Sequence, residues 1–380
     1  MKQSPLVFII GIFFLSSCST TKVNSPSDVN INIIEEKNEL TLLFAGDIMA
    51  HPEITERNYD SLLKDIEPII KSADFAFANF ESTVNDELPQ SGYPLFNCHR
   101  AYAEKIIAGG FNVFSLANNH INDFHLEGLD STKAFFDSKK DAGIYSAGIK
   151  DAKNAPIKFI LIEKNGIKIL FAAVTEVLNF TTELEYFDFL KETPKARQEF
   201  LGQIQSEKIK NNADILVLSF HTAEPEYERS IAEKSKNFYY SLINNGADIL
   251  WINHPHVSKE WEVIHTKDNK QKIIFYSVGN TVSSQRRRPN FKKPDSPRDY
   301  TGDSFLFTVK IEKTADGVVI ESPEPELITT CITENSEFVV KKLDDALINR
   351  LKEDGNEKWA AYLSERKKLM ENIKGKDTWQ

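Results

Sequence analysis

Short apolar runs that end abruptly in polar residues are the feature that most constrains how this chain can fold. Such runs of strand length lie at residues 40–45, 75–78, 111–114, 215–220 and 249–252. Continuous apolar strands are typical of sheets that are covered on both faces. Stretches with apolar residues at helical spacing lie at residues 59–71, 126–136 and 230–244. Together the runs and helices predict an α/β fold.

Turn signals show that the sheets are not purely parallel. Asn165-Gly166 separates the runs at 158–163 and 168–174, which predicts an antiparallel hairpin. Asp268-Asn269 predicts a second hairpin in the same way. The strands of that hairpin are expected at residues 261–265 and 272–278. Two late strands are expected at 304–311 and 318–321, and a charged helical region at 343–373. The aromatic and acidic stretch 176–200 has no clear period and is interpreted as an insertion near the site.

The N-terminal segment, residues 1–18, resembles the signal of a bacterial lipoprotein. An apolar stretch too short to span a membrane ends at Leu15-Ser16-Ser17-Cys18, as a lipobox does. Cys18 would then become the acylated residue, and residues 19–39 a flexible tether. An ordinary secretory peptide or an uncleaved anchor is the alternative. The expected location is the bacterial cell envelope, with the chain held at the membrane by lipid.

Charge and cysteine content exclude several classes of protein. A formal net charge of −10 argues against a nucleic-acid partner, because such proteins need a surplus of Lys and Arg. No Cys-x-x-Cys occurs, which removes thiolate zinc sites and Fe–S clusters. Cys98 and Cys331 could pair in an exported protein or remain two buried free thiols.

Ligand-type side chains stand at or just after the carboxyl ends of the apolar runs. They are Asp47, Glu81, Asn119, His221, His254 and His256. Because such strand ends share one edge of a sheet, these side chains are expected to converge. Oxygen and nitrogen ligands suit a divalent metal such as Mn, Fe, Zn or Mg. With one bridging carboxylate the set could hold one or two ions.

The strand-to-helix turn at residues 115–123 is the densest of these stretches. It reads Ser-Leu-Ala-Asn-Asn-His-Ile-Asn-Asp, so it can present two amides and an imidazole to one point. Alternatively, Asn118 and Asn119 cap the next helix and His120 is a hydrogen-bonded core histidine. Basic residues at 286–298 either form a solvated surface or steer a negatively charged substrate.

Ordered motifs make the chain resemble the CapA family of poly-γ-glutamate capsule proteins, which itself resembles the calcineurin-like metallophosphoesterases. The motifs are residues 46–49 (Gly-Asp-Ile-Met), 79–81 (Asn-Phe-Glu), 115–120 (Ser-Leu-Ala-Asn-Asn-His), 254–256 (His-Pro-His) and 276–280 (Tyr-Ser-Val-Gly-Asn). The resemblance implies a four-layer α/β/β/α sandwich over residues 40–330, followed by a charged helical tail over 331–380.

The same resemblance implies roles for individual residues. Asp47 matches the first metal aspartate of the phosphoesterases and Glu81 their bridging acid. The remaining expected ligands are Asn119, His221, His254 and His256. His120, with Asp123, matches the residue that assists the leaving group, whereas Met49 stands where phosphoesterases have a histidine ligand. Expected substrate contacts are Asn118, Glu226, Tyr227, Asn280 and Arg287.

Three functions are compatible with this pattern. The first is a metal-dependent hydrolase of a phosphoester or of an amide such as the γ-glutamyl bond. The second is an accessory lipoprotein that binds an anionic polymer during capsule synthesis or export, together with membrane proteins of that process. The third is a non-catalytic structural protein of the envelope. The motifs favour a role in capsule or poly-γ-glutamate metabolism and leave catalysis open.

Overall fold

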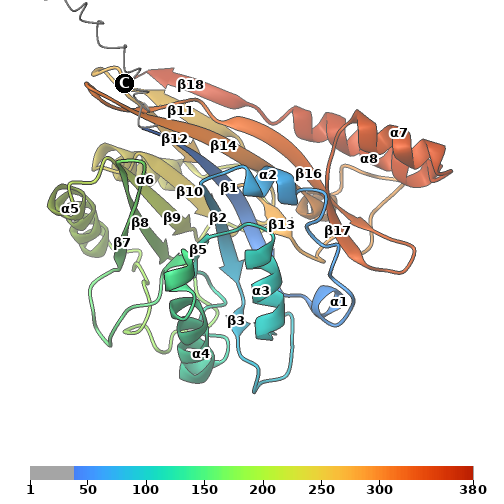
Figure 1. The fold of residues 1–380 in the computed structure, drawn as a ribbon, viewed down its shortest axis with the longest axis horizontal. Helices are drawn as coiled ribbons and strands as arrows, with labels where there is room; N and C mark the ends of the chain where they lie inside the picture. Colours follow the sequence, from blue (N-terminus) through green and yellow to red (C-terminus); the bar gives the residue numbers. More distant parts are fainter. Residues whose placement is uncertain (1–37, 380) are drawn as a thin grey trace, which may run out of the picture. The chain divides into compact units, whose positions relative to one another are not determined.

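Two mixed β-sheets form the centre of the molecule in the computed structural model, which describes residues 38–379 (Figure 1). The predicted lipoprotein signal, Cys18 and nearly all of the predicted tether lie outside the described residues. The first sheet has the order β17-β16-β14-β1-β2-β5-β6, with β13 beside β1 and β15 beside β14. The second sheet has the order β18-β11-β12-β10-β9-β8-β7.

The strands of the first sheet come from both ends of the described chain. They are β1 (Glu39–Met49), β2 (Phe75–Glu81), β5 (Val113–Ser115), β6 (Tyr145–Ala147), β13 (Asn280–Val282), β14 (Asp303–Thr314), β15 (Gly317–Ile320), β16 (Glu324–Ile332) and β17 (Phe338–Lys342). Parallel pairing joins β1 to β2, β2 to β5 and β5 to β6, whereas β14, β15, β16 and β17 pair antiparallel.

The second sheet contains both predicted hairpins. Its strands are β7 (Phe159–Lys164), β8 (Ile167–Thr175), β9 (Ile215–His221), β10 (Ile249–Asn253), β11 (Trp261–His265), β12 (Gln271–Phe275) and β18 (Gly375–Trp379). The pairs β7–β8 and β11–β12 are antiparallel, as the Asn165-Gly166 and Asp268-Asn269 turns predicted. A separate two-stranded ribbon joins β3 (Thr83–Val84) and β4 (Asn97–Cys98).

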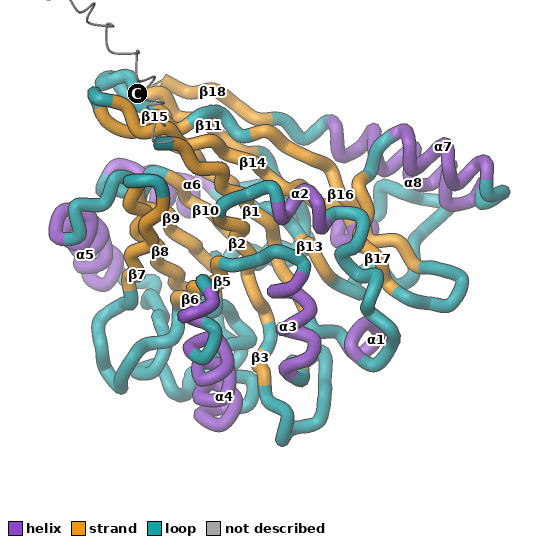
Figure 2. Tube along the Cα trace, in the orientation of Figure 1, coloured by secondary structure: helices purple, strands orange, loops and turns teal. Residues whose placement is uncertain are grey.

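Helices cover the outer face of each sheet, and the last two helices pack on the inner face of the first sheet (Figure 2). The α-helices are α1 (Pro52–Thr55), α2 (Glu67–Lys71), α3 (Arg100–Ala108), α4 (His125–Asp137), α5 (Pro194–Lys210), α6 (Glu233–Asn244), α7 (Asp345–Glu353) and α8 (Glu357–Glu371). Short 3-10 turns lie at Lys140–Ala142 and Pro297–Gly302.

The two sheets and the helices on their outer faces form four layers of backbone. Three apolar layers lie between them. Between the sheets, Phe44 of β1 stacks on Phe77 of β2, with ring centroids 4.8 Å apart, and both contact Trp251 of β10. The alternate residue Leu43 belongs to the layer under α3 and α4, and Leu218 of β9 to the layer under α5 and α6. Because both faces of each sheet are covered, its central strands need apolar residues on both faces. The predicted four-layer α/β/β/α sandwich is therefore confirmed.

Two predictions about local structure need correction. The apolar spacing over 59–71 predicted one helix, but only Glu67–Lys71 is α-helical, and residues 60–66 form turns whose Leu62 and Ile66 are still buried. Pro68 explains part of this difference, because proline is accepted in the first turn of a helix, whereas in a helix interior its ring clashes with the carbonyl four residues before it.

The predicted helical tail over 331–380 also differs from the structure. It contains α7 and α8, but it adds β17 to the first sheet and β18 to the second, and Leu363 and Met370 of α8 are fully buried. The boundary at residue 330 therefore divides a strand, β16, rather than two domains.

The open questions about cysteines are settled within the described chain. Cys98 and Cys331 are both buried, and neither forms a disulfide there. Burial raises the pKa of the Cys98 thiol to about 12 and that of Cys331 to about 11, so both are neutral, unreactive thiols at physiological pH. Across residues 38–379, none of the helices is both long and apolar enough to cross a membrane.

Asp188 should make stability depend on pH. Its Oδ2 accepts a hydrogen bond from Lys158 N (3.1 Å), but within the described chain its Oδ1 has no partner. Burial raises the pKa of Asp188 from 3.8 to about 7. The folded state therefore binds this proton more tightly than the unfolded state, so the free energy of unfolding falls as pH rises from about 4 to about 7.

We expect Asp188→Asn to raise the free energy of unfolding by about 1–2 kcal/mol more at pH 8 than at pH 5, because the amide carries no charge to desolvate. Urea unfolding at the two pH values measures the difference. An equal effect at both pH values would show that Asp188 does not titrate in this range.

Candidate metal centre and substrate cleft

The carboxyl ends of the parallel strands place the acidic candidates side by side. In the register of β1 and β2, Asp47 lies opposite Asn79 and Met49 opposite Glu81. Asp47 also pairs with Asn280 of β13, and its N–H donates to Gly279 O (2.9 Å). This approach requires Gly46, because a Cβ there would lie 1.7 Å from Gly279 O. The two glycine-containing motifs therefore fit against each other at the site.

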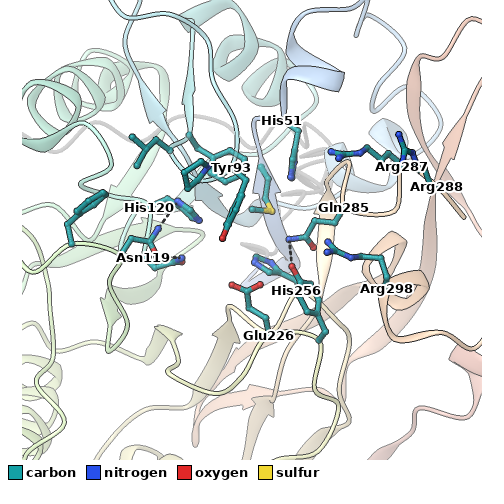
Figure 3. Close-up of a pocket in the computed structure, with 17 residues that line it drawn as sticks. His51, Tyr93, Asn119, His120, Glu226, His256, Gln285, Arg287, Arg288 and Arg298 are labelled. Carbon is teal, nitrogen blue, oxygen red and sulfur yellow. Dashed lines mark hydrogen bonds between the residues drawn. The ribbon is translucent and has the colours of Figure 1, made fainter.

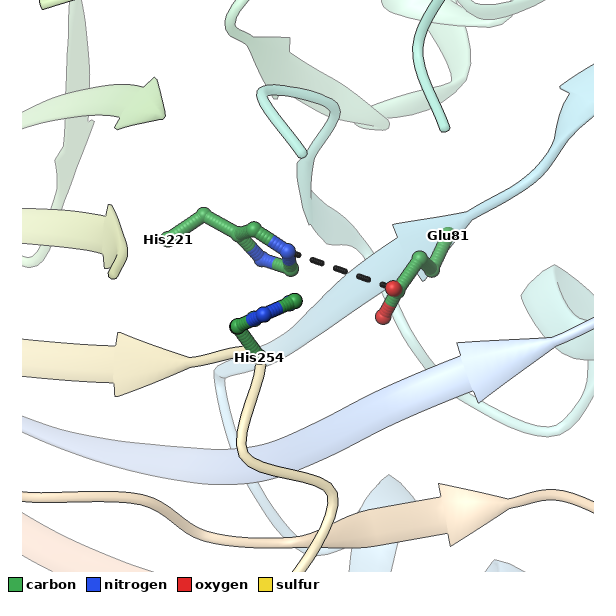
Figure 4. Close-up of side chains that lie close together, drawn as sticks. All are labelled: Glu81, His221 and His254. Carbon is green, nitrogen blue, oxygen red and sulfur yellow. Dashed lines mark ion pairs between the residues drawn. The ribbon is translucent and has the colours of Figure 1, made fainter. Parts of the chain in front are cut away.

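Histidines from the second sheet complete the cluster. Glu81 Oε1 lies 3.8 Å from His256 Nε2 and 3.9 Å from His221 Nε2. His256 Nδ1 lies 3.0 Å from Asp47 Oδ2, and His221 Nε2 lies 2.8 Å from Asn119 Oδ1. All the ligand candidates predicted from the sequence thus lie around one point. Figure 4 shows Glu81, His221 and His254 pointing toward one another from three separate strand ends.

Three overlapping groups of side chains could each hold a metal ion. They are Asp47, Glu81 and His256; Glu81, His221 and His254; and Glu226, His254 and His256, and in each group the ligand atoms lie within 4.8 Å of one another. Glu81 is shared by the first two groups. A carboxylate with two oxygens can join two ions in this way.

The protonation states and free atoms of the cluster fit a divalent cation. Among the described residues, Glu81 Oε1 and His254 Nδ1 are buried polar atoms without a hydrogen-bond partner. Burial raises the pKa of Glu81 well above its usual value, so the carboxylate needs a positive charge nearby to stay ionised. Burial also lowers the pKa of His254 to about 3 and that of His221 well below 6.5. Neutral imidazoles are the form that binds metals. For His256, burial also opposes a charge, but Glu81 and Asp47 outweigh it and raise the pKa to about 9, so a metal ion bound there would displace a proton.

Asn79 holds the cluster in place, a role that the sequence interpretation did not assign to it. Its side-chain amide donates to Asp47 Oδ1 (2.8 Å) and to Glu81 Oε2 (3.4 Å), and lies 3.4 Å from His221 Nδ1. Its contacts therefore leave Glu81 Oε1, Asp47 Oδ2 and His221 Nε2 on the side of the centre, where Asp47 Oδ2 contacts His256 and His221 Nε2 contacts Asn119. Its position in the Asn79-Phe80-Glu81 motif was the available signal.

His120 and Asp123 form a second functional unit next to the cluster. His120 Nδ1 lies 2.7 Å from Asp123 Oδ2, which also accepts a hydrogen bond from Phe96 N (2.6 Å). An ionised Asp123 only accepts hydrogen bonds, so it places a proton on Nδ1 and turns Nε2 toward Glu81 Oε1, 3.9 Å away. The ring of Phe96 packs edge-on against His120 with centroids 4.6 Å apart.

A cavity of about 1000 Å³ opens onto this unit and the cluster (Figure 3). Predicted site residues that line it are Asn119, His120, Glu226, Tyr227, His256 and Arg287. Arg288 and Arg298, from the basic stretch that was expected either to be solvated or to steer a substrate, also line it. Residues that the sequence interpretation did not assign to the site include His51, Tyr93, Phe96, Asn179 and Gln285. Asn179 and Phe180 come from the aromatic stretch that was interpreted as an insertion near the site mouth.

Two predicted substrate contacts have other roles. Asn118 Nδ2 donates to Phe80 O (2.9 Å) and its Oδ1 accepts from His120 N (3.1 Å), so Asn118 fixes the turn that carries His120. Asn280 Nδ2 donates to Thr301 O (3.0 Å), and its Oδ1 lies 3.0 Å from His256 Nδ1. Both side chains are buried and hydrogen-bonded within the protein, so they position histidines.

Three arginines lie on the side of the cavity away from His120, as Figure 3 shows. Arg287 forms an ion pair with Glu53 (2.6 Å), whereas Arg298 lies over the Tyr227 ring at 4.9 Å. Within residues 38–379, no acidic side chain forms an ion pair with Arg288 or Arg298. We call Arg287, Arg288 and Arg298 the arginine wall. In a protein of net charge −10, it is a local region of positive charge.

Comparison with known proteins identifies the family. The protein-family model described as bacterial capsule synthesis protein PGA_cap matches residues 41–285 of this chain. A capsule biosynthesis protein CapA of Bacillus anthracis is 30% identical over 263 residues, covering 66% of this chain and 61% of that protein. A PGA biosynthesis protein CapA of Bacillus subtilis (strain 168) is 28% identical over 362 residues, covering 90% of this chain and 89% of that protein.

Solved structures give weaker matches. A hypothetical protein from Thermus thermophilus has a TM-score of 0.42 and 14% identity, covering 76% of this chain and 98% of that chain. The calcineurin-like phosphoesterase YfkN from Bacillus subtilis has a TM-score of 0.41 and 14% identity, covering 86% of this chain and 99% of that chain. The family assignment rests on the sequence match, which extends from β1 to the residue before Arg286. The chain belongs to the bacterial capsule synthesis protein family PGA_cap.

Proposed function

We propose that this chain acts in capsule synthesis as a metal-dependent hydrolase whose cleft takes an anionic polymer, with a phosphoester or γ-glutamyl amide as the bond that is cleaved. The observation that supports hydrolysis most directly is the His120–Asp123 pair, whose Nε2 faces the Glu81 cluster at the edge of the cavity. A structural role for His120 does not require its Nε2 to face the ligand cluster at a cleft.

The buried residues divide into two ligand groups. Asp47, Glu81 and His256 would hold one divalent ion, and Glu81, His221 and His254 would hold a second, with Asn119 beside His221. Mn, Fe and Zn all accept such oxygen and nitrogen donors. A bound divalent ion activates water and polarises the bond to be cleaved.

His120 supplies the proton chemistry. Its Nε2 can hold a proton for a departing oxygen or nitrogen, while Asp123 stabilises the imidazolium through Nδ1–H. The Phe96 N–H keeps Asp123 oriented, and the Phe96 ring covers one side of the imidazole. His120 is thus held in one orientation before any substrate arrives, which lowers the entropy cost of reaction.

The arginine wall supports an anionic substrate. Guanidinium groups bind carboxylates and phosphates through paired N–H donors. Arg288 and Arg298, which lack ion-pair partners among the described residues, face the cavity that His120 also lines. An anionic polymer could therefore lie along this wall with one bond near His120.

One observation favours a binding protein that does not catalyse. Met49 lines the cavity beside the cluster, and its sulfur lies 3.8 Å from Ser283 Oγ. A thioether is a soft ligand and a poor one for Mn or Mg. Position 49 therefore adds no ligand to the oxygen and nitrogen donors of the cluster. On this alternative the cleft would hold the polymer during synthesis or export without cleaving it.

Turnover separates the two functions. Purified protein loaded with Mn, Fe or Zn is incubated with poly-γ-glutamate and, separately, with a phosphodiester, and new chain ends or released phosphate are measured. The proposal predicts metal-dependent cleavage of at least one substrate. Binding of the polymer without cleavage of either substrate would assign the cleft to the binding protein.

The predicted lipoprotein signal extends the proposal to an envelope location. Since Cys18 would carry the acyl chains, Cys18→Ser should move the protein from the membrane fraction to the soluble fraction of cells. Immunoblots of the two fractions measure the change, with Cys98→Ser as the control at a cysteine in the folded part. Equal membrane association of the Cys18 variant and the parent would contradict the anchor.

A further inference from the structure

Glu226 lies on the solvent side of the metal-ligand cluster. Its carboxylate and the ring nitrogens of His254 and His256 lie within 4.8 Å of one another. Glu226 is exposed, whereas the two histidines are buried and also belong to the two inner ligand groups. In Figure 3, Glu226 lies next to His256 and its carboxylate points into the cavity.

The backbone places this carboxylate in one position. Tyr227 N donates to Pro255 O (2.9 Å), so the loop after β9 is joined to the His254-Pro255-His256 turn. Tyr227, His254 and His256 all have positive φ values, 64°, 104° and 59°. Residues with a Cβ rarely adopt a positive φ, because this backbone conformation costs on the order of 1–3 kcal/mol for each residue. Backbone strain at adjoining positions of both turns indicates that the position of Glu226 next to the histidines has a function.

Charge balance indicates what that purpose is. Two divalent ions in the inner groups would be compensated by only two buried carboxylates, Asp47 and Glu81. Each uncompensated positive charge in a region shielded from water is costly. A third carboxylate on the open side removes one of these charges. His254 Nδ1 is buried and without a hydrogen-bond partner among the described residues, so His254 has a ring nitrogen that could bind an ion.

We propose that Glu226 is a metal ligand that adds a carboxylate from the open side to the ion held through His254, with His256 beside it. This inference rests on the proposed metal centre and assigns Glu226 a role other than substrate binding. An ion that is held from the open side by one exposed carboxylate can exchange with solvent, whereas an ion held by Asp47 and Glu81 is enclosed. The two ions should therefore differ in affinity and in release rate.

Metal binding tests the assignment without any substrate. Manganese binding to the purified protein is followed by calorimetry, metal content by mass spectrometry, and release by the rate of transfer to a chelator. In Glu226→Gln, the weaker-bound ion should lose about tenfold or more in affinity and leave faster, while the tighter ion is unchanged. Glu228→Gln, an exposed acid two residues away in the same loop, is the matched control and should behave as the parent.

Each result decides between specific alternatives. Manganese affinity and release in Glu226→Gln equal to those of the parent would overturn the assignment while leaving the inner centre intact. Equal losses in the Glu226 and Glu228 variants would also overturn it, because they would reflect general surface charge. A parent protein that binds no metal would instead remove the proposed centre as a whole. Partial recovery in Glu226→Asp would support direct ligation by a carboxylate.

Discussion

Replacing His120 with Asn should slow the cleavage of an anionic phosphoester or γ-glutamyl substrate by about a hundredfold or more, because general acid catalysis typically contributes that much. The Asn side chain is polar and smaller, so it keeps the surroundings of the turn but cannot donate a proton as an imidazolium does. His120 Nε2 lies 3.9 Å from Glu81 Oε1, outside the groups of ligand atoms. Metal content and melting temperature should therefore stay close to those of the parent.

A companion variant distinguishes proton transfer from packing. Asp123→Asn removes the charge that orients His120 and stabilises its imidazolium, while its amide oxygen can still accept from Phe96 N. It should lower kcat more than it changes KM, and it should move the alkaline limb of the pH–rate profile to lower pH, because the imidazolium loses its stabilising charge. Unchanged rates in both variants would show that His120 has no part in the reaction. Loss of metal from the His120 variant would show instead that this residue is a ligand.

Removing the carboxylate of Asp303 should destabilise the fold by about 3–5 kcal/mol, because it leaves buried cations without a counter-charge. Asp303 Oδ1 lies 2.6 Å from Arg286 Nη1, and its Oδ2 lies 2.6 Å from Arg366 Nε of α8. All three side chains are at most 1% exposed. The variant Asp303→Ala therefore leaves two guanidinium groups facing a small apolar side chain.

Urea unfolding measures this effect, and the exposed pair Lys342–Glu326 provides the control. Glu326→Ala should cost less than about 1 kcal/mol, since its pair is accessible to water. Arg366 Nη1 also donates to Pro294 O (2.6 Å), and Tyr362 OH donates to Asp299 Oδ1, so α8 supports the loop that carries the arginine wall. A loss of stability in Asp303→Ala no larger than in Glu326→Ala would contradict this account of the buried network.

Those features that follow from local chemistry were predictable from the sequence. Continuous apolar runs such as 215–220 identify strands covered on both faces, and Asn165-Gly166 identifies a hairpin. The convergence of Asp47, Glu81 and the strand-end histidines follows from one geometric rule, that parallel strands end at a common edge. The layer architecture and the family were expected from ordered motifs, and the family match and the sheets confirm them.

Features that depend on long-range contacts were not predictable. Asn118 and Asn280 resemble substrate contacts in sequence, but they donate to backbone carbonyls of Phe80 and Thr301 that only the fold brings near. Strand β18 follows a charged helix and has no apolar pattern, and its pairing with β11 depends on where α8 ends. The arginine wall depends likewise on Arg366, about eighty residues from Arg288 along the chain.

The most direct test of the account is the metal content of the purified protein together with its thermal melting in the presence and absence of a chelator. Because a ligand that binds only the folded state stabilises it, by about 2.7 kcal/mol at a hundred times Kd, bound metal should raise the melting temperature. The account predicts at least one Mn, Fe or Zn ion per chain, and loss of both metal and stabilisation in His254→Ala and Glu81→Ala. A parent protein that contains no metal, and whose melting responds to none of the three, would contradict it.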